Sequence, residues 1–213
     1  AVWRPSNGNW YFNTGTDYQV HTWGEAGDIP QTGDFNGDGK ADFAIFRPSN
    51  GTWYIKHTDN TFRVFQFGIP TDKPAAADYD GDGRTDAGVF RSGTWYTQGS
   101  TAGFRVTQFG QTNDVPVPAD YDGDGAADIA VYRNGTWFAL SASSYTVRTY
   151  GGNAGDVPVP ADYDGDGKTD LAIFRPSEGR FYIKKSSALE GSNPDETISL
   201  GGATDTAVAG PGQ

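Results

Sequence analysis

The sequence predicts an all-β protein, a five-bladed β-propeller of four-stranded antiparallel blades. Three observations lead to this fold. An acidic loop of the form D-x-D/N-G-D-G-x-x-D occurs four times, with first acids 42 to 44 residues apart. A hydrophobic run ending in arginine occurs five times, each followed by a turn and a strand with two adjacent aromatic residues. No segment shows helical periodicity, and a four-stranded unit repeated at this length is typical of a propeller blade.

The composition is that of one domain spanning residues 1–213. The chain is 36% hydrophobic, which is enough for one sizeable all-β core. The absence of cysteine excludes disulfides, thiolate metal sites and cysteine nucleophiles. No apolar run approaches the roughly 18 residues of a membrane span, so we expect no membrane insertion. The chain opens directly in a strand-like pattern without a signal sequence, which we interpret as a mature or excised form.

The formal net charge of −11 comes mostly from the acidic loops. They hold 15 of the 27 Asp and Glu residues, which leaves 12 acids against 16 Lys and Arg. Four bound Ca²⁺ would bring the net charge to −3. Because no basic stripe remains, the sequence does not favour a nucleic-acid partner.

Each predicted blade contains the same elements in the same order. The hydrophobic-arginine runs end at Arg4, Arg47, Arg91, Arg133 and Arg175. The aromatic strands begin at Trp10, Trp53, Trp95, Trp137 and Phe181. A turn joins the two, such as the two-residue hairpin signal Asn134-Gly135. A further strand ends on a hydrophobic-Gly step, and a short apolar strand then leads into the next acidic loop.

Two of these repeated sets have a predicted structural role. The five arginines recur beside five acids, which predicts one ion pair in each blade, with Asp28, Asp72, Asp114, Asp156 and Asp205. The five aromatic residues that begin the third strands are predicted to pack between blades rather than to stack on sugars. Trp3 and Trp23 are unusual among their repeat equivalents, and we expect them to make exposed contacts.

The two ends of the chain are predicted to complete one blade, shared between residues 1–24 and 205–213. The chain starts at the second strand of a blade, and residues 207–211 resemble a first strand. Pro211 stands where the next loop would have its first acid, so the fifth metal site is lost. We expect the last strand to close its own ring, because the connection before it has ordinary length. The alternative is that it completes a blade in a neighbouring molecule.

The acidic loops are candidate calcium sites. Positions 1, 3, 5 and 9 supply side-chain oxygens, position 7 a backbone carbonyl, and glycines at positions 4 and 6 allow the tight turn. Position 9 is the expected bidentate ligand. EF-hand and dockerin loops begin in the same way but continue into a helix, whereas β-branched and aromatic residues follow here, including Ile173 at position 12. The predicted ligands are Asp34, Asn36, Asp38, Lys40, Asp42, Asp78, Asp80, Asp82, Arg84, Asp86, Asp120, Asp122, Asp124, Ala126, Asp128, Asp162, Asp164, Asp166, Lys168 and Asp170.

These repeats resemble the FG-GAP/VCBS family, the propeller repeats of integrin α-chain heads, some fungal lectins and many bacterial surface proteins. The resemblance covers the whole chain and depends on the four acidic loops and on steps such as Phe67-Gly68 and Phe109-Gly110. It implies about four Ca²⁺, bound by positions 1, 3, 5 and 9 of each loop. The chain departs from the integrin pattern in having five repeats rather than seven.

The sequence favours a non-catalytic protein in which calcium is structural. His21 and His57 fall at different places in the repeat, and no Ser-His-acid or Cys-His set can be assembled. Paired carboxylates for glycoside hydrolysis stay open as an alternative, because nearly every exposed acid cluster resembles such a pair in sequence. Repeated Ca²⁺ loops of this kind are filled at extracellular calcium levels, so we expect a secreted or cell-surface protein. Two hypotheses of function remain. One is a lectin-like or adhesive module that binds a glycan or a surface protein in clefts between blades. The alternative is a self-assembling subunit of an extracellular filament or surface array.

Overall fold

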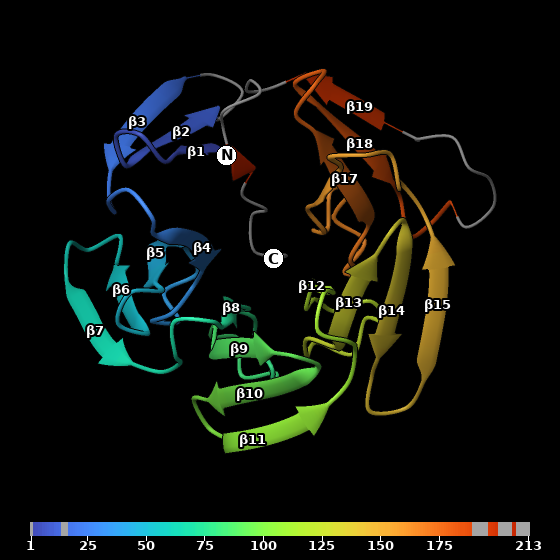
Figure 1. The fold of residues 1–213 in the computed structure, drawn as a ribbon, viewed down its shortest axis with the longest axis horizontal. Helices are drawn as coiled ribbons and strands as arrows, with labels where there is room; N and C mark the ends of the chain where they lie inside the picture. Colours follow the sequence, from blue (N-terminus) through green and yellow to red (C-terminus); the bar gives the residue numbers. More distant parts are fainter. Residues whose placement is uncertain (1, 14–16, 189–195, 200–205, 208–213) are drawn as a thin grey trace.

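The five predicted blades are present as five sheets arranged around a common centre (Figure 1). The structure, a computed structural model, describes residues 2–13, 17–188, 196–199 and 206–207. Within these ranges, twenty strands form five antiparallel sheets of four strands each, and no helix occurs. Over the same residues there is accordingly no helix with the length and apolarity needed to cross a membrane. The predicted fold, a five-bladed β-propeller, is confirmed.

Four blades are built from consecutive strands, numbered here from the innermost strand outward. Blade 1 comprises β4 (Ile29–Gly33), β5 (Asp42–Arg47), β6 (Thr52–Lys56) and β7 (Phe62–Gln66). Blade 2 comprises β8 (Lys73–Pro74), β9 (Ala87–Arg91), β10 (Thr94–Gly99) and β11 (Gly103–Gln108). Blade 3 comprises β12 (Val115–Pro116), β13 (Ile129–Arg133), β14 (Thr136–Leu140) and β15 (Tyr145–Thr149). Blade 4 comprises β16 (Val157–Pro158), β17 (Leu171–Arg175), β18 (Arg180–Lys184) and β19 (Glu196–Ser199).

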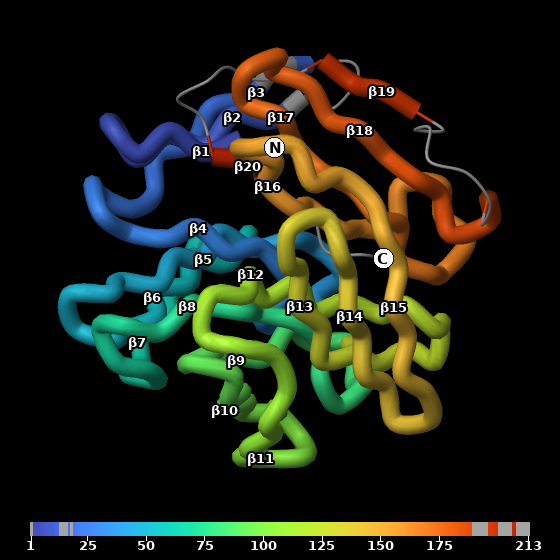
Figure 2. Tube along the Cα trace, turned by 45° about the vertical axis from the view of Figure 1, so that its right-hand side comes forward, coloured from blue at the N-terminus to red at the C-terminus, as the bar shows by residue number. Residues whose placement is uncertain are grey.

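Blade 5 joins the two ends of the chain, as the sequence predicts. It comprises β20 (Thr206–Ala207), β1 (Val2–Arg4), β2 (Asn9–Asn13) and β3 (Tyr18–Thr22). Trp3 lies opposite Thr206, and Val2 lies opposite Ala207, in an antiparallel pair. The red C-terminal strand lies beside the dark blue β1 in both views (Figures 1 and 2). The ring is therefore closed within one chain. Pro211 and the lost fifth site lie outside the described residues.

The core lies between the blades, because both faces of each middle strand are covered by a neighbour. In blade 1, Trp53 and Ile55 are fully buried and pack against Ala87 and Val89 of blade 2. Burial decreases outward along each blade, and four of the five residues of β7 are exposed. The third-strand aromatics are all buried, which confirms their predicted packing role: Trp10, Trp53, Trp95, Trp137 and Phe181.

The expectation that Trp3 is exposed was wrong. Its side chain is 1% exposed and packs with Trp10 and Ile45 between blades 5 and 1, and its Nε1–H donates to the carbonyl of Trp23 at 3.3 Å. A second strand is covered on both faces, so a larger residue there adds to the core rather than to the surface. Trp23 is partly buried and stacks on the exposed ring of Phe62 at 5.4 Å.

The predicted ion pair is present in blades 1 to 4. The four Nε–Oδ1 distances are 2.6 to 2.8 Å, for Arg47–Asp28, Arg91–Asp72, Arg133–Asp114 and Arg175–Asp156. Burial alone would raise the pKa of Asp114, but hydrogen bonds from Arg133 and Gln111 lower it below its ordinary value. In blade 5, Arg4 lies over the ring of Tyr11 at 4.6 Å, and its predicted partner Asp205 lies outside the described residues.

Two turn predictions have different outcomes. The Asn134-Gly135 turn is confirmed, because Arg133 pairs with Thr136 and both turn residues have positive φ, of 47° and 84°. The Gly, Ser, Asn and Pro content of residues 186–196 predicts a lengthened, solvated loop in blade 4. Most of this loop, residues 189–195, lies outside the described part of the chain.

Candidate metal centres

The four acidic loops gather around the central channel. In blades 1 to 4, each loop connects the innermost strand with the second strand. The channel has a volume of about 930 Å³, and its wall includes the first acid of every loop, namely Asp34, Asp78, Asp120 and Asp162. Since each loop occupies the same place in its blade, the four loops form a ring of negatively charged turns.

The first acid of each loop organises the turn around its own carboxylate. In the second loop, Oδ1 of Asp78 accepts the backbone N–H groups of Gly81 and Asp82 at 2.7 and 3.2 Å, and Oδ2 accepts that of Gly83 at 2.8 Å. Gly81 and Gly83 have φ of 71° and 84°, a conformation that other L-residues rarely adopt. The same three bonds occur around Asp34, Asp120 and Asp162. The loop geometry therefore follows from the repeated sequence pattern.

The ninth acid of each loop is buried beneath the turn. Asp86 is 2% exposed, and its carboxylate accepts the N–H groups of Tyr79 at 3.0 Å and Ser100 at 2.7 Å. Burial raises the pKa of Asp86 to about 6, because two backbone hydrogen bonds do not offset desolvation and the repulsion from Asp80 and Asp78. The ninth acids of the other loops are equally buried: Asp42, Asp128 and Asp170.

The ninth acids of the third and fourth loops are also harder to ionise than an ordinary carboxyl group. Burial raises the pKa of Asp128 to about 6, with repulsion from Asp122 and Asp120 adding to it. Burial likewise raises the pKa of Asp170. A buried carboxylate with a raised pKa is stabilised by a nearby cation. Among the described residues, no lysine or arginine forms a hydrogen bond with Asp86, Asp128 or Asp170.

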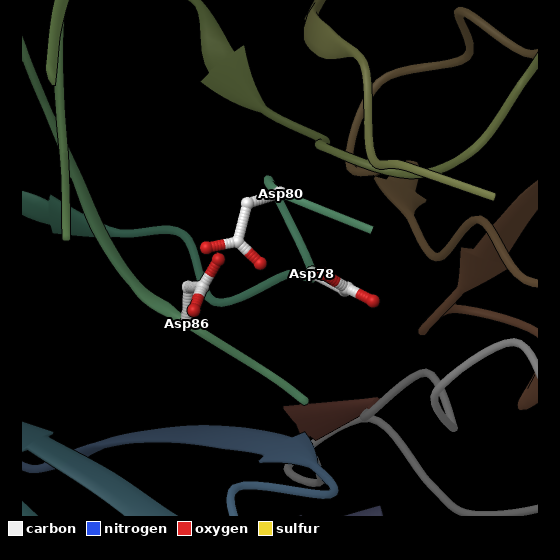
Figure 3. Close-up of side chains that lie close together, drawn as sticks. All are labelled: Asp78, Asp80 and Asp86. Carbon is white, nitrogen blue, oxygen red and sulfur yellow. The ribbon is translucent and has the colours of Figure 1, made fainter. Parts of the chain in front are cut away.

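Three of the loops bring carboxylate oxygens to within 4.8 Å of one another. The groups are Asp78, Asp80 and Asp86; Asp120, Asp122 and Asp128; and Asp162, Asp164 and Asp166. Figure 3 shows the carboxylates of Asp80 and Asp86 pointing toward one another, with Asp78 beside them. Oδ1 of Asp80 is buried and has no hydrogen-bond partner, although Oδ2 accepts two backbone N–H groups. A buried, unpaired oxygen among converging carboxylates fits a divalent cation bound by oxygen ligands.

The residues at positions 5 and 7 of the loops are more exposed to solvent than those at position 9. Asp82 accepts the N–H of Arg84 at 2.9 Å and the hydroxyl groups of Ser100 and Thr101. The N–H of the seventh residue donates to the fifth acid in the other loops too, for Lys40, Ala126 and Lys168. The predicted use of the seventh carbonyl as a metal ligand remains a prediction.

The first loop differs from the other three. Position 3 is Asn36, and the loop is not among the converging carboxylate groups found in the described residues. Its buried ninth acid, Asp42, lies 2.8 Å from Nδ1 of His57, which is itself buried. Asp42 also accepts the N–H groups of Phe35 and Thr58. The predicted ligands of this loop thus lie in the expected turn, but an imidazole already partners the most buried one.

Neighbouring loops are joined to one another by short backbone hydrogen bonds. The eighth residue of one loop donates its N–H to the carbonyl of the first acid of the loop before it: Thr85 to Asp34, Ala127 to Asp78 and Thr169 to Asp120, at 2.6 to 2.7 Å. Thr85 also packs on Gly33, where an added Cβ would meet its hydroxyl at 2.2 Å. Adjacent acidic loops are therefore in direct contact from blade to blade.

Sequence reasoning missed the residues that support the loops from the end of the third strand. Thr58, Ser100 and Ser186 each donate a backbone N–H to the ninth acid and a hydroxyl to the fifth. A hydroxyl residue just after the third strand in these three repeats was the available signal. The sequence shows only that His57 lies at a different place in the repeat from His21. Its contact with Asp42 depends on where β6 ends.

Comparison with known proteins supports the repeat assignment. The FG-GAP-like repeat family matches residues 34–89, and the FG-GAP repeat family matches residues 154–189. Both ranges contain acidic loops described above. No curated protein matches the chain.

Solved propeller structures resemble the fold at low sequence identity. A catalytically inactive H270A virginiamycin B lyase from Staphylococcus aureus, crystallised with quinupristin, matches with a TM-score of 0.51 and 11% identity, over 86% of this chain and 61% of that one. A lectin from Agrocybe aegerita that recognises non-reducing terminal N-acetylglucosamine matches with a TM-score of 0.49 and 16% identity, over 85% and 57%. BBS1N in complex with ARL6DN matches with a TM-score of 0.44 and 14% identity, over 81% and 53%. The chain thus spans little more than half the length of these structures.

Proposed function

This chain belongs to the FG-GAP-like repeat family, and from that premise we propose that it is a calcium-stabilised, non-catalytic binding module that works outside the cell. The observation that carries the proposal is the group formed by Asp78, Asp80 and Asp86 (Figure 3). It holds a fully buried carboxylate whose charge is disfavoured and a second carboxylate oxygen without a partner. A cation at this position would relieve both.

The donor set suits calcium better than other metals. The candidate ligands are carboxylate oxygens with one amide, and the predicted set adds a backbone carbonyl, without thiolate or imidazole in the three converging groups. Ca²⁺ takes six to eight such oxygens in flexible geometry, whereas Mg²⁺ demands a near-ideal octahedron and keeps several waters. Exposed calcium loops of this kind fill at extracellular calcium levels, which supports a secreted or surface location.

Calcium would act here mainly on stability. The loops are bonded to one another from blade to blade, through Thr85, Ala127 and Thr169. Neutralising each buried ninth acid would therefore strengthen the ring as a whole, because every loop is also a contact between blades. The loop carboxylates already serve backbone N–H groups or hydroxyls, which favours a supporting role over acid-base catalysis.

Exposed aromatic rings between the blades support carbohydrate binding. Phe62, Phe104 and Tyr145 lie at the first or second position of the outermost strands of blades 1, 2 and 3 and are 56% to 59% exposed. Each contacts an aromatic residue of the preceding blade, in the pairs Trp23–Phe62, Phe67–Phe104 and Phe109–Tyr145, at centroid distances of 5.4 to 6.3 Å. Flat, exposed rings that pack against a neighbouring blade offer a stacking surface for a sugar ring.

Two measurements test this proposal. Calorimetric titration of the calcium-free protein should show three or more Ca²⁺ sites, and Asp86→Asn should remove one of them. A glycan-binding screen in millimolar Ca²⁺ should give at least one ligand whose binding is lost in Phe104→Ala. Absence of calcium binding would overturn the metal role, and hydrolysis of any screened glycan would overturn the non-catalytic assignment.

Self-assembly is the second candidate function, favoured by the outermost strands. Strands β7, β11 and β15 have a neighbour on one side only and expose apolar side chains, among them Val64, Val106 and Val147 at 52% to 57%. Such edges pair readily with another chain. Sedimentation and electron microscopy in millimolar Ca²⁺ distinguish the two, because isolated rings would contradict assembly. The intramolecular pairing of β1 with β20 argues against assembly by exchange of that strand.

A further inference from the structure

The side chain at position 7 of an acidic loop lies against the loop of the preceding blade. A Cβ added at Gly37, position 4 of the first loop, would meet Nε of Arg84 from the second loop at 2.8 Å. A Cβ added at Gly123, position 4 of the third loop, would meet Cε of Lys168 from the fourth loop at 3.0 Å. In both cases a cationic side chain packs on the turn between the predicted ligands at positions 3 and 5 of its neighbour.

This placement follows from the hydrogen bond that joins neighbouring loops. The next residue along the chain, at position 8, donates its N–H to the carbonyl of the first acid of the preceding loop, as Thr85 does to Asp34 and Thr169 to Asp120. Because the backbone makes this bond, it holds position 7 at the contact between loops whatever side chain stands there.

The second and third loops are a matched pair that differs in this contact. Both have aspartate at positions 1, 3, 5 and 9, both bring the carboxylates of positions 1, 3 and 9 together, and burial raises the pKa of the ninth acid to about 6 in both. The third loop contacts Lys168 at Gly123, whereas a Cβ added at Gly81 of the second loop would meet only the methyl group of Ala126, at 3.5 Å, and backbone atoms of Gly125. The two loops therefore have the same predicted side-chain ligands but a different charge beside them.

The cation at position 7 also lies near the fifth acid of its own loop. The hydrogen bond from Ser100 is the main cause that lowers the pKa of Asp82, and the charge of Arg84 adds only a smaller lowering. In the fourth loop, the hydroxyl of Ser186 likewise lowers the pKa of the fifth acid more than the charge of Lys168 does. Because each cation packs on the turn of the preceding loop, we expect its larger electrostatic effect there.

We infer that the residue at position 7 of one acidic loop sets the calcium affinity of the preceding loop, so that Arg84 weakens binding in the first loop and Lys168 in the third. A positive charge beside a site repels a divalent ion twice as strongly as a monovalent one. It also partly balances the loop carboxylates before the ion arrives. The second loop, which contacts Ala126, has no such charge from its neighbour. Both effects rest on the proposed calcium binding.

A calcium titration of the full chain, followed by heteronuclear NMR, reads the four loops separately. The reporters are the amide groups of the position-6 glycines, each of which donates to the first acid of its own loop: Gly39, Gly83, Gly125 and Gly167. The variants are Ala126→Lys, Arg84→Gln and Lys168→Gln. Lysine already stands at position 7 of the first and fourth loops, and Arg84 and Lys168 are exposed, so folding is expected to be retained. Lys40→Gln is the matched control, because no other acidic loop of the chain precedes the first loop.

The second and third loops should exchange their behaviour in these variants. In the parent chain, the Gly83 signal should reach half-saturation at a lower Ca²⁺ concentration than the Gly125 signal. Ala126→Lys should raise the half-saturation concentration at Gly83 roughly three- to tenfold, and Lys168→Gln should lower that at Gly125 by a similar factor.

The first loop and the salt dependence give two further readouts. Arg84→Gln should lower the half-saturation concentration at Gly39, whereas Lys40→Gln should leave those at Gly83 and Gly125 unchanged. At about 1 M KCl, where the screening length is about 3 Å, the differences between the variants and the parent chain should shrink.

Three results would overturn the inference. If Ala126→Lys moves the midpoint at Gly125 instead of Gly83, the charge acts on its own loop. Differences that persist unchanged in high salt would reflect packing rather than charge. Saturation of all four signals at midpoints that no variant moves would overturn this inference and leave the proposed metal role intact. A parent chain in which no glycine signal responds to calcium would overturn both.

Discussion

The first and second acidic loops share one frame of hydrogen bonds but surround their buried ninth acid differently. In both, the first acid accepts three backbone N–H groups of its own turn. In the second loop, burial raises the pKa of Asp86, and a neighbouring carboxylate oxygen of Asp80 has no partner. In the first loop, His57 lies 2.8 Å from the equivalent acid, Asp42. The same turn is therefore built around ninth acids with different surroundings, an imidazole in the first loop and further carboxylates in the second.

Removal of calcium is expected to have the largest effect. A site held at about one hundred times its dissociation constant contributes roughly 2.7 kcal/mol, and each kcal/mol corresponds to about 2–4 °C in a chain of this size. With three converging groups, excess EDTA should lower the melting temperature by more than about 10 °C. Differential scanning calorimetry with and without Ca²⁺ measures this, with Mg²⁺ as the control ion. An unchanged melting temperature in EDTA would contradict the supporting role.

The two loops should respond in opposite ways to loss of the ninth charge. Without calcium, Asp86→Asn removes a disfavoured charge, so stability should stay the same or rise. Asp42→Asn weakens the contact with His57 and should lower stability by about 1–3 kcal/mol. In calcium, Asp86→Asn should become the more destabilising of the two. Thermal unfolding of both variants in EDTA and in Ca²⁺ tests this crossover, and parallel behaviour would mean that the loops are equivalent.

The pH dependence of stability should change sign with calcium. The pKa of Asp86 and Asp128 is about 6 in the folded protein, above the ordinary 3.8, so the folded state takes up protons that the unfolded chain does not. In EDTA, the free energy of unfolding should therefore rise as the pH falls from 7 through 6 toward 4. In calcium it should fall, because protons displace the metal. Urea unfolding along this series measures both slopes.

A matched variant shows whether those two acids are responsible. The Asp86→Asn, Asp128→Asn double variant should lose the rise seen in EDTA. Below pH 4 the trend should reverse for every variant, since hydrogen bonds hold the pKa of carboxylates such as Asp82 below the ordinary value. A rise in the double variant as large as in the parent chain would assign the effect to other groups.

The sequence predicted the features that recur in every repeat, but it did not predict the contacts that one blade makes with the next. The blades, the Arg–Asp pairs and the turns around Asp34 and its equivalents are local patterns repeated in register. The burial of Trp3 depends on the blade that packs against it, which no local pattern encodes. Such contacts between blades are where equivalent positions differ.

The smallest expected effect concerns His57, whose ring stands where the other loops have no such partner. His57→Ala should lower stability in EDTA by about 1–3 kcal/mol, because Asp42 stays buried with one partner fewer. The gain in melting temperature on adding calcium should then exceed that of the parent chain, since the released carboxylate oxygen becomes available to the ion. His21→Ala is the control for loss of an imidazole, because His21 is exposed and its ring contacts Phe12 and Phe43 rather than an acid of the loop. If calcium stabilises the His57 variant no more than the parent, the imidazole supports the strand end alone, and the difference between the first two loops must come from Asn36 or from Arg84.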